Sequence, residues 1–121
     1  MYRLSFSKLY DKDIESSYNY ISNNLEAPVA ADNLIREVLK KLNKIKENPN
    51  IRPLVQDKYL ASLGYRLINV NNYMIFYIIG DDDKHIKVVR FLYNKRNWIN
   101  ILKEISYWRN NVKHATSPNK R

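Results

Sequence analysis

The spacing of apolar residues changes near the middle of this chain, and this change limits the fold more than any other feature. In residues 8–47 apolar side chains recur every three or four positions, as in helices that pack through one face. After Gly64, short apolar runs are separated by turns rich in Asn, Asp and Gly, as in consecutive antiparallel strands. Helices followed by a block of strands predict an α+β domain.

A short strand and two helices are predicted before the strand block. Residues 2–6 alternate between apolar and polar side chains, which indicates a half-buried strand. The first helix begins after Ser7, a suitable N-cap, and the second runs from Pro28 to about Glu47. Only a few residues join the helices, so we expect an antiparallel helical hairpin that covers one face of a sheet. Residues 48–63 have no clear period and are predicted to be a linker.

Three strands and a last helix are predicted in the second half of the chain. The middle strand is apolar on both faces, so it should lie in the centre of the sheet. The predicted order is β-α-α-β-β-β-α, with the hairpin packed on a mostly antiparallel four-stranded sheet and a C-terminal helix. The predicted bounds are 65–70, 73–79 and 86–93 for the strands and about 96–109 for the helix.

Length and charge indicate one basic domain. The chain has 121 residues, and we expect a single domain over residues 1–111 with a disordered basic tail over 112–121. The net charge is +9, and residues 64–121 alone carry 11 Lys and Arg against 4 Asp and Glu. A basic half favours a polyanionic partner such as RNA, DNA or an acidic protein. The alternative is that the charge serves solubility only.

Several kinds of site are excluded or disfavoured by composition. The chain has no Cys, so disulfides and cysteine zinc sites are excluded. No apolar run is long enough for a signal peptide or a membrane helix, so we expect a cytoplasmic protein without a membrane partner. The acidic run at residues 81–83 is predicted to be a solvated turn, because no other carboxylates converge on it. We therefore expect no metal and no cofactor.

Several motifs occur in order along the chain. In the hairpin, Pro28 is followed by Ala30-Ala31, and the second helix ends between Leu42 and Pro49. The strand motifs are Gly64-Tyr65-Arg66, Asn72-Tyr73-Met74-Ile75-Phe76-Tyr77 and Val89-Arg90-Phe91-Leu92-Tyr93-Asn94-Lys95-Arg96-Asn97-Trp98. Over residues 2–102 this ordered set resembles the RelE/ParE toxin superfamily, and its strand motifs are ParE-like.

The resemblance implies the toxin of a type II toxin–antitoxin system, of the kind that serves plasmid stabilization. Such a toxin arrests growth and is neutralised by an antitoxin, which the charge of this chain predicts to be small and acidic. ParE-like members inhibit DNA gyrase, whereas RelE-like members cleave mRNA on the ribosome without a metal. RelE-like members carry basic residues, and a tyrosine, at places that hold Ile68, Met74 and Leu102 here. The resemblance therefore favours gyrase.

Two alternatives stay open at this point. The basic sheet half still allows a ribosome-dependent mRNA endonuclease, and a non-toxic or decayed nucleic-acid-binding module is the third reading. The oligomeric state does not follow from the sequence.

Five residues are candidates for contact with the target or with an anion, since arginine matches phosphate oxygens and aromatic rings can stack on bases. Arg90 shares a predicted strand face with the apolar Ile86, Val88 and Leu92. It therefore either contacts an anion or a partner, or pairs with a helix carboxylate or backbone carbonyls. An exposed basic pair can equally be solvated, and a tyrosine can equally be core. The five are Arg66, Arg90, Tyr93, Lys95 and Arg96, of which Arg66, Arg90 and Arg96 are the catalytic candidates if the protein is an endonuclease.

The last predicted helix carries a wide apolar stripe rich in tryptophan. Tryptophan is common in binding hot spots, so this stripe is predicted to bind the antitoxin. The alternative is that it docks on the sheet. Its members are Trp98, Ile101, Leu102, Ile105 and Trp108. The remaining candidate, His85, lies at a predicted turn, where a solvated role is the ordinary one.

Overall fold

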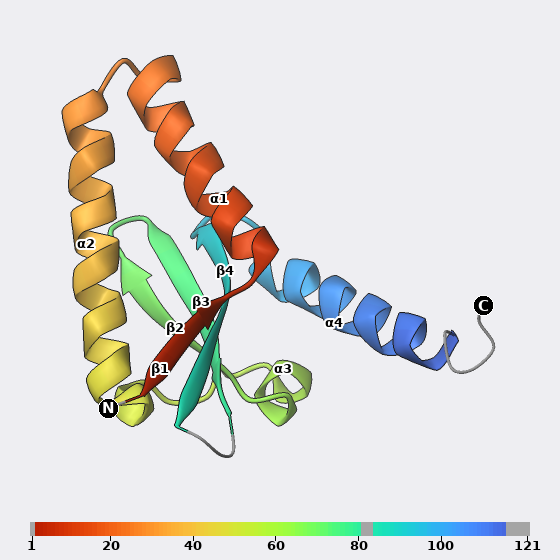
Figure 1. Cartoon of the computed structure of the whole chain (residues 1–121). Helices are drawn as coiled ribbons and strands as arrows, with labels where there is room; N and C mark the ends of the chain where they lie inside the picture. The colour runs from red at the N-terminus through yellow and green to blue at the C-terminus, as the bar shows by residue number, and fades with distance from the viewer. Residues whose placement is uncertain (1, 81–83, 116–121) are drawn as a thin grey trace.

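A helical hairpin covers one face of a four-stranded sheet, and a shorter and a longer helix lie on the other side (Figure 1). The computed structural model describes residues 2–80 and 84–115, with side chains described as far as Ser106. The elements are β1 (Arg3–Phe6), α1 (Lys8–Asn19), a π-helical segment (Tyr20–Asn24), α2 (Pro28–Glu47), a 3-10 turn (Pro49–Ile51), α3 (Lys58–Ser62), β2 (Tyr65–Val70), β3 (Tyr73–Ile79), β4 (His85–Tyr93) and α4 (Trp98–Ala115).

The predicted α+β class and element order are confirmed, with two differences in the helices. The segment 48–63, predicted to be a linker, contains the 3-10 turn and the short helix α3. α4 runs to Ala115 rather than to about Arg109, so it includes the first part of the predicted tail. The rest of that tail, 116–121, lies outside the described residues.

The strand order in the sheet is β1-β4-β3-β2. β2, β3 and β4 form the predicted antiparallel meander, whereas β1 pairs with β4 in parallel. The sheet is therefore mixed. β1 lies beside the last strand, β4, and the hairpin belongs to the connection that crosses the sheet from β1 to β2, the two edge strands.

A β-bulge in β4 changes which face its later residues occupy. Phe76 pairs with Arg90 and Tyr77 pairs with Val88, so one residue of β4 has no partner in the register. The sequence pattern placed Val88, Arg90 and Leu92 on one face, and the structure shows this to be wrong. Val88 packs under the hairpin, whereas Leu92 packs on the opposite side of the sheet.

Each face of the sheet has its own buried cluster. The hairpin-side cluster includes Leu34, Val38 and Ile45 of α2 together with Ile75 and Tyr77 of β3. The opposite cluster includes Leu60, Tyr65, Met74, Phe76, Val89, Leu92 and Leu102. Because β3 is buried on both faces, its predicted central position is confirmed. Each fully buried large apolar side chain contributes about 1.5–3 kcal/mol to folding.

Ser7 joins the start of the hairpin to the sheet. Its Oγ accepts the Tyr10 N–H at 3.0 Å, which confirms the predicted N-cap of α1. The same hydroxyl donates to the Val89 carbonyl at 2.5 Å. One short side chain thus ends β1, begins α1 and anchors both to the bulge in β4.

Candidate functional site

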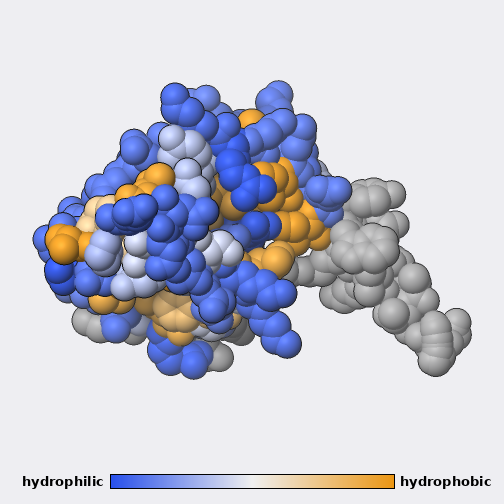
Figure 2. All heavy atoms as spheres, turned by 90° about the horizontal axis from the view of Figure 1, so that it is seen from above, coloured by the Kyte–Doolittle hydropathy of each residue, from blue (hydrophilic) through white to orange (hydrophobic). Residues whose placement is uncertain are grey.

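A cleft opens between the hairpin and the ends of β3 and β4, and we call it the aromatic cleft. Its volume is about 680 Å³. Figure 2 looks down on this end of the molecule and shows apolar patches between hydrophilic side chains. The lining residues are Asp13, Ser16, Ser17, Tyr20, Ile21, Leu25, Asn72, Tyr73, Phe91, Tyr93 and Arg96.

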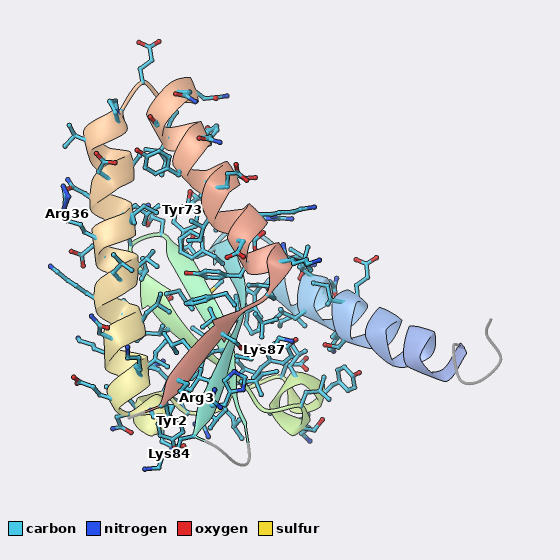
Figure 3. All side chains as sticks on the ribbon, viewed as in Figure 1. Tyr2, Arg3, Arg36, Tyr73, Lys84 and Lys87 are labelled. Atoms are coloured by element: carbon cyan, nitrogen blue, oxygen red, sulfur yellow. The ribbon has the colours of Figure 1, made fainter. Side chains whose placement is uncertain are left out.

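Three aromatic rings form one wall of the aromatic cleft. The Tyr73 and Phe91 rings are stacked, with centroids 4.7 Å apart and planes 6° apart. The Tyr93 ring meets Tyr73 edge-on at 5.5 Å. Figure 3 labels Tyr73, whose side chain lies between the hairpin and the sheet. Tyr93 remains 39% exposed, so the outer end of this wall offers a ring face to a partner.

The opposite wall comes from α1 and the π-helical segment that follows it. The segment has longer hydrogen-bond steps, as in the bond from the Leu25 N–H to the Tyr20 carbonyl at 3.0 Å. Tyr20 is 52% exposed and Leu25 is 55% exposed. π-helical insertions occur often at functional sites, and this one widens the helix where it borders the aromatic cleft.

Asp13, one of the lining residues of the aromatic cleft, forms a buried ion pair with Arg90. The guanidinium donates to both carboxylate oxygens, at 2.7 and 2.9 Å, and the two side chains are only 11% and 12% exposed. Asp13 also accepts the Phe91 N–H at 3.0 Å. β1 ends opposite Val88, so β4 has no strand partner on that side beyond this point. The Asp13 carboxylate accepts the Phe91 N–H in place of a carbonyl from a neighbouring strand. The pairing with a helix carboxylate, weighed from the sequence, is thus present, and the charge of Arg90 is neutralised.

The predicted basic pair lies at the mouth of the aromatic cleft. Lys95 and Arg96 are both exposed, and Arg96 is part of the lining. The turn that carries them is held by the Asn94 N–H, which donates to the Asn72 carbonyl at 2.8 Å. These side chains place positive charge beside the exposed ring of Tyr93.

Arg66 lies elsewhere, on the edge strand β2. Its guanidinium donates to the Arg52 carbonyl at 2.5 Å. The backbone of Leu54 forms an isolated antiparallel β-bridge with that of Arg66. It is placed opposite Tyr77, whose hydroxyl donates to the Pro49 carbonyl at 2.8 Å. Burial raises the pKa of Tyr77, and the nearby Arg66 and Arg52 oppose that rise. The structure therefore places Tyr93 and Arg96 in the lining of the aromatic cleft, beside Lys95 in the chain, and Arg90 is paired with another lining residue, Asp13. Arg66 lies apart from them.

The first part of α4 packs on the sheet face opposite the hairpin. Leu102 is fully buried, and the Trp98 ring lies 5.2 Å from that of Phe76. Ile101 and Ile105 are half-buried, and the side chain of Trp108 lies outside the described residues. The alternative reading, docking on the sheet, is thus present for this part of the helix, and Leu102 has no surface left for a partner.

Comparison with known proteins identifies the family. Residues 4–98 match the family model described as the ParE toxin of the type II toxin–antitoxin system parDE. The chain belongs to the ParE toxin family. None of the curated proteins matches this ParE-family chain. Its fold is similar to a chain of the chromosomal ParDE toxin–antitoxin system from P. aeruginosa, with a TM-score of 0.60 and 15% identity, covering 77% of this chain and 96% of that one. The superfamily predicted from the strand motifs is confirmed.

Sequence reasoning missed half of the site of this ParE-family chain. The α1 side, with Asp13, Ser16, Ser17 and Tyr20, was not predicted. A signal existed only for Asp13, because a partly buried arginine requires an acid and α1 offers one. The residues Ser16, Ser17 and Tyr20 gave no signal, since their position depends on how the hairpin tilts over the sheet. Within the described residues, no group of His and carboxylate side chains could hold a metal, and no helix could cross a membrane.

Proposed function

We propose that this chain arrests growth by inhibiting DNA gyrase, and that the mouth of the aromatic cleft contacts the target. The family supports a type II toxin, because the ParE family model matches residues 4–98, a range that includes the strand motifs. In this proposal Tyr93, Lys95 and Arg96 form the contact, because they combine an exposed ring with two exposed cations. Arg90 supports the contact from behind through its pair with Asp13.

The observation that carries the choice of gyrase is that the arginines do not converge. Metal-free RNA cleavage needs a cation on the phosphate next to groups that move protons. Here Arg66 is bound to a carbonyl on one sheet edge, Arg90 is bound to a carboxylate, and Arg96 lies at the cleft mouth. Because Arg66 and Arg90 are already paired and Arg66 lies on another edge, this arrangement supports binding to a protein surface better than it supports catalysis.

The positions at which RelE-like members carry reactive residues support the same choice. Ile68 and Met74 are each 6% exposed, and Leu102 is fully buried. These side chains belong to the two cores, so replacing them with Lys, Arg or Tyr would disrupt packing. A core that occupies the catalytic positions supports a toxin that acts by binding.

The partner in this proposal is a small acidic antitoxin. A net charge of +9 favours an acidic partner with an association rate that falls with salt. Trp98, Ile101 and Ile105 retain some exposure and stay candidates for its contact surface, together with Trp108. Trp108 lies beyond the described side chains.

The test separates the two targets with purified chain and matched variants. Wild type, Arg96→Ala and Tyr93→Ala are compared in a gyrase supercoiling assay and in ribosome-dependent mRNA cleavage. Arg36→Ala is the control, since this exposed arginine lies on the outer side of α2 (Figure 3). We expect wild type and control to stop supercoiling while mRNA stays intact, and both cleft variants to lose potency. Arg66→Ala and Arg90→Ala are added to the cleavage assay, and cleavage of mRNA that depends on Arg66, Arg90 and Arg96 would refute the gyrase proposal. Expression in cells without any effect on growth would refute both toxin readings.

A further inference from the structure

A second polar surface lies on the sheet, at the end away from the aromatic cleft. It is formed by the first residues of β1 and β4, which pair in parallel so that Arg3 faces His85 and Ser5 faces Lys87. Their neighbours Leu4 and Ile86 pack under the hairpin. Because side chains alternate along a strand, these four polar residues share the opposite face. We call them, together with Lys84, the basic strand patch.

The cations of the basic strand patch are exposed and close together. Arg3, Lys84 and Lys87 are all exposed, and Figure 3 shows them near the starts of β1 and β4. Neighbouring strands lie about 4.8 Å apart, and residues two positions apart on a strand are separated by about 6.6 Å. The cations of the patch are therefore close enough for one ligand to contact all of them. The Lys84 carbonyl accepts the Arg3 N–H at 2.8 Å, which fixes the two backbones side by side.

Two polar groups between the cations are held in place. His85 Nε2 and Ser5 Oγ lie 2.7 Å apart and are hydrogen-bonded. Both residues are half-buried, so the pair forms the floor between the exposed cations. Lys84 has a φ of +47°, a left-handed conformation that residues other than Gly, Asn and Asp seldom adopt. Positive φ is common in the turns between strands, and Lys84 directly precedes β4.

We propose that the basic strand patch binds the phosphate backbone of duplex DNA. It offers three cations and the hydroxyl of Ser5, which is the chemistry of non-specific phosphate contacts. Single-stranded nucleic acid is usually held by stacking on exposed rings. The aromatic residues beside the β1 part of the patch are Tyr2 and Phe6, which share the strand parity of Leu4. Tyr2 packs against the hairpin-side cluster and the Phe6 ring lies 5.2 Å from that of Tyr10 in α1, so neither ring lies on the face of the patch. The patch therefore fits a regular backbone better than splayed bases.

This inference goes beyond the proposed gyrase target, since it concerns the toxin without any enzyme present. DNA binding is compatible with the gyrase proposal, because a protein that binds gyrase also comes close to the DNA bound by gyrase. Asp81, Asp82 and Asp83 precede Lys84 in the sequence and lie outside the described residues. Their negative charge repels phosphate, so a variant without that charge is a second part of the test.

The test measures binding of the full chain, made by cell-free synthesis, to a short labelled duplex over a salt series. The variant Arg3→Ala/Lys84→Ala/Lys87→Ala is compared with Arg36→Ala/Lys40→Ala/Lys44→Ala, which removes the same charge from the outer face of α2. If three cations each neutralise one phosphate, wild-type affinity should fall by roughly 40-fold between about 50 and 200 mM salt. The patch variant should lose that dependence, with a salt slope smaller by about 3. Replacing Asp81, Asp82 and Asp83 with Asn should strengthen binding.

Several outcomes would overturn the proposal. Equal losses in both triple variants would show that only net charge matters, and loss in the α2 variant alone would place the DNA on the helix. Tighter binding to single-stranded RNA than to duplex DNA would also overturn it. Circular dichroism checks that each variant is folded. If the triple patch variant is unfolded, the single variant Lys87→Ala is tested instead, and its salt slope should be smaller by about 1. Gyrase is absent from this assay, so failure of the gyrase proposal leaves its result unaffected.

Discussion

Breaking the pair between Asp13 and Arg90 should destabilise the fold more than any exposed ion pair could. Asp13→Ala leaves a guanidinium, on a side chain only 11% exposed, without its partner, and it leaves the Phe91 N–H without an acceptor. Removing one member of a buried pair costs about 3–5 kcal/mol. For a chain of this length, such a loss lowers Tm by roughly 10–20 °C.

The assay is thermal and urea unfolding of Asp13→Ala, Arg90→Met and the double variant Asp13→Leu/Arg90→Met. Because two apolar side chains of similar volume need no ion partner, the double variant should recover much of the loss. Asp11→Ala is the matched control from the same turn of α1, and we expect a change below about 1 kcal/mol from its place near the helix N-terminus. A loss below about 1 kcal/mol for Asp13→Ala, or a double variant that adds both losses, would refute the reasoning.

Three further predictions concern stability. Burial, together with Asp11 and Asp13, raises the pKa of Tyr10 above its ordinary value of about 10, so the contribution of Tyr10 to stability should be constant below about pH 10 and fall above it. Tyr10→Phe should reduce this alkaline loss in urea unfolding across pH, leaving the share that comes from Tyr77, and an undiminished loss in the variant would exclude Tyr10 as a source. Ser7→Ala removes the N-cap of α1 and the bond to Val89, and it should cost about 1–2 kcal/mol by the same method, against little change for the exposed Ser62→Ala. Gly64 has a φ of +92°, so Gly64→Ala should cost about 1–2 kcal/mol, and an unchanged Tm would contradict the strain.

The sequence by itself determined the α+β class, the order of the main elements and the central place of β3. These follow from local pattern, because the period of apolar residues selects helix or strand and Ser7 or Pro28 marks where a helix begins. The family resemblance rests on the same local motifs. Features that depend on residues a few positions apart in the chain can therefore be predicted from the sequence.

Only the tertiary structure decided which side chains meet. The parallel pairing of β1 with β4 joins residues far apart in the chain, and the bulge in β4 changes the face of everything after it. These two features bring Asp13 to Arg90 and place Arg66 on a distant edge. Register and the tilt of packed elements depend on the whole core, and no short stretch of sequence encodes them. For that reason the aromatic cleft and the basic strand patch became visible only in the fold.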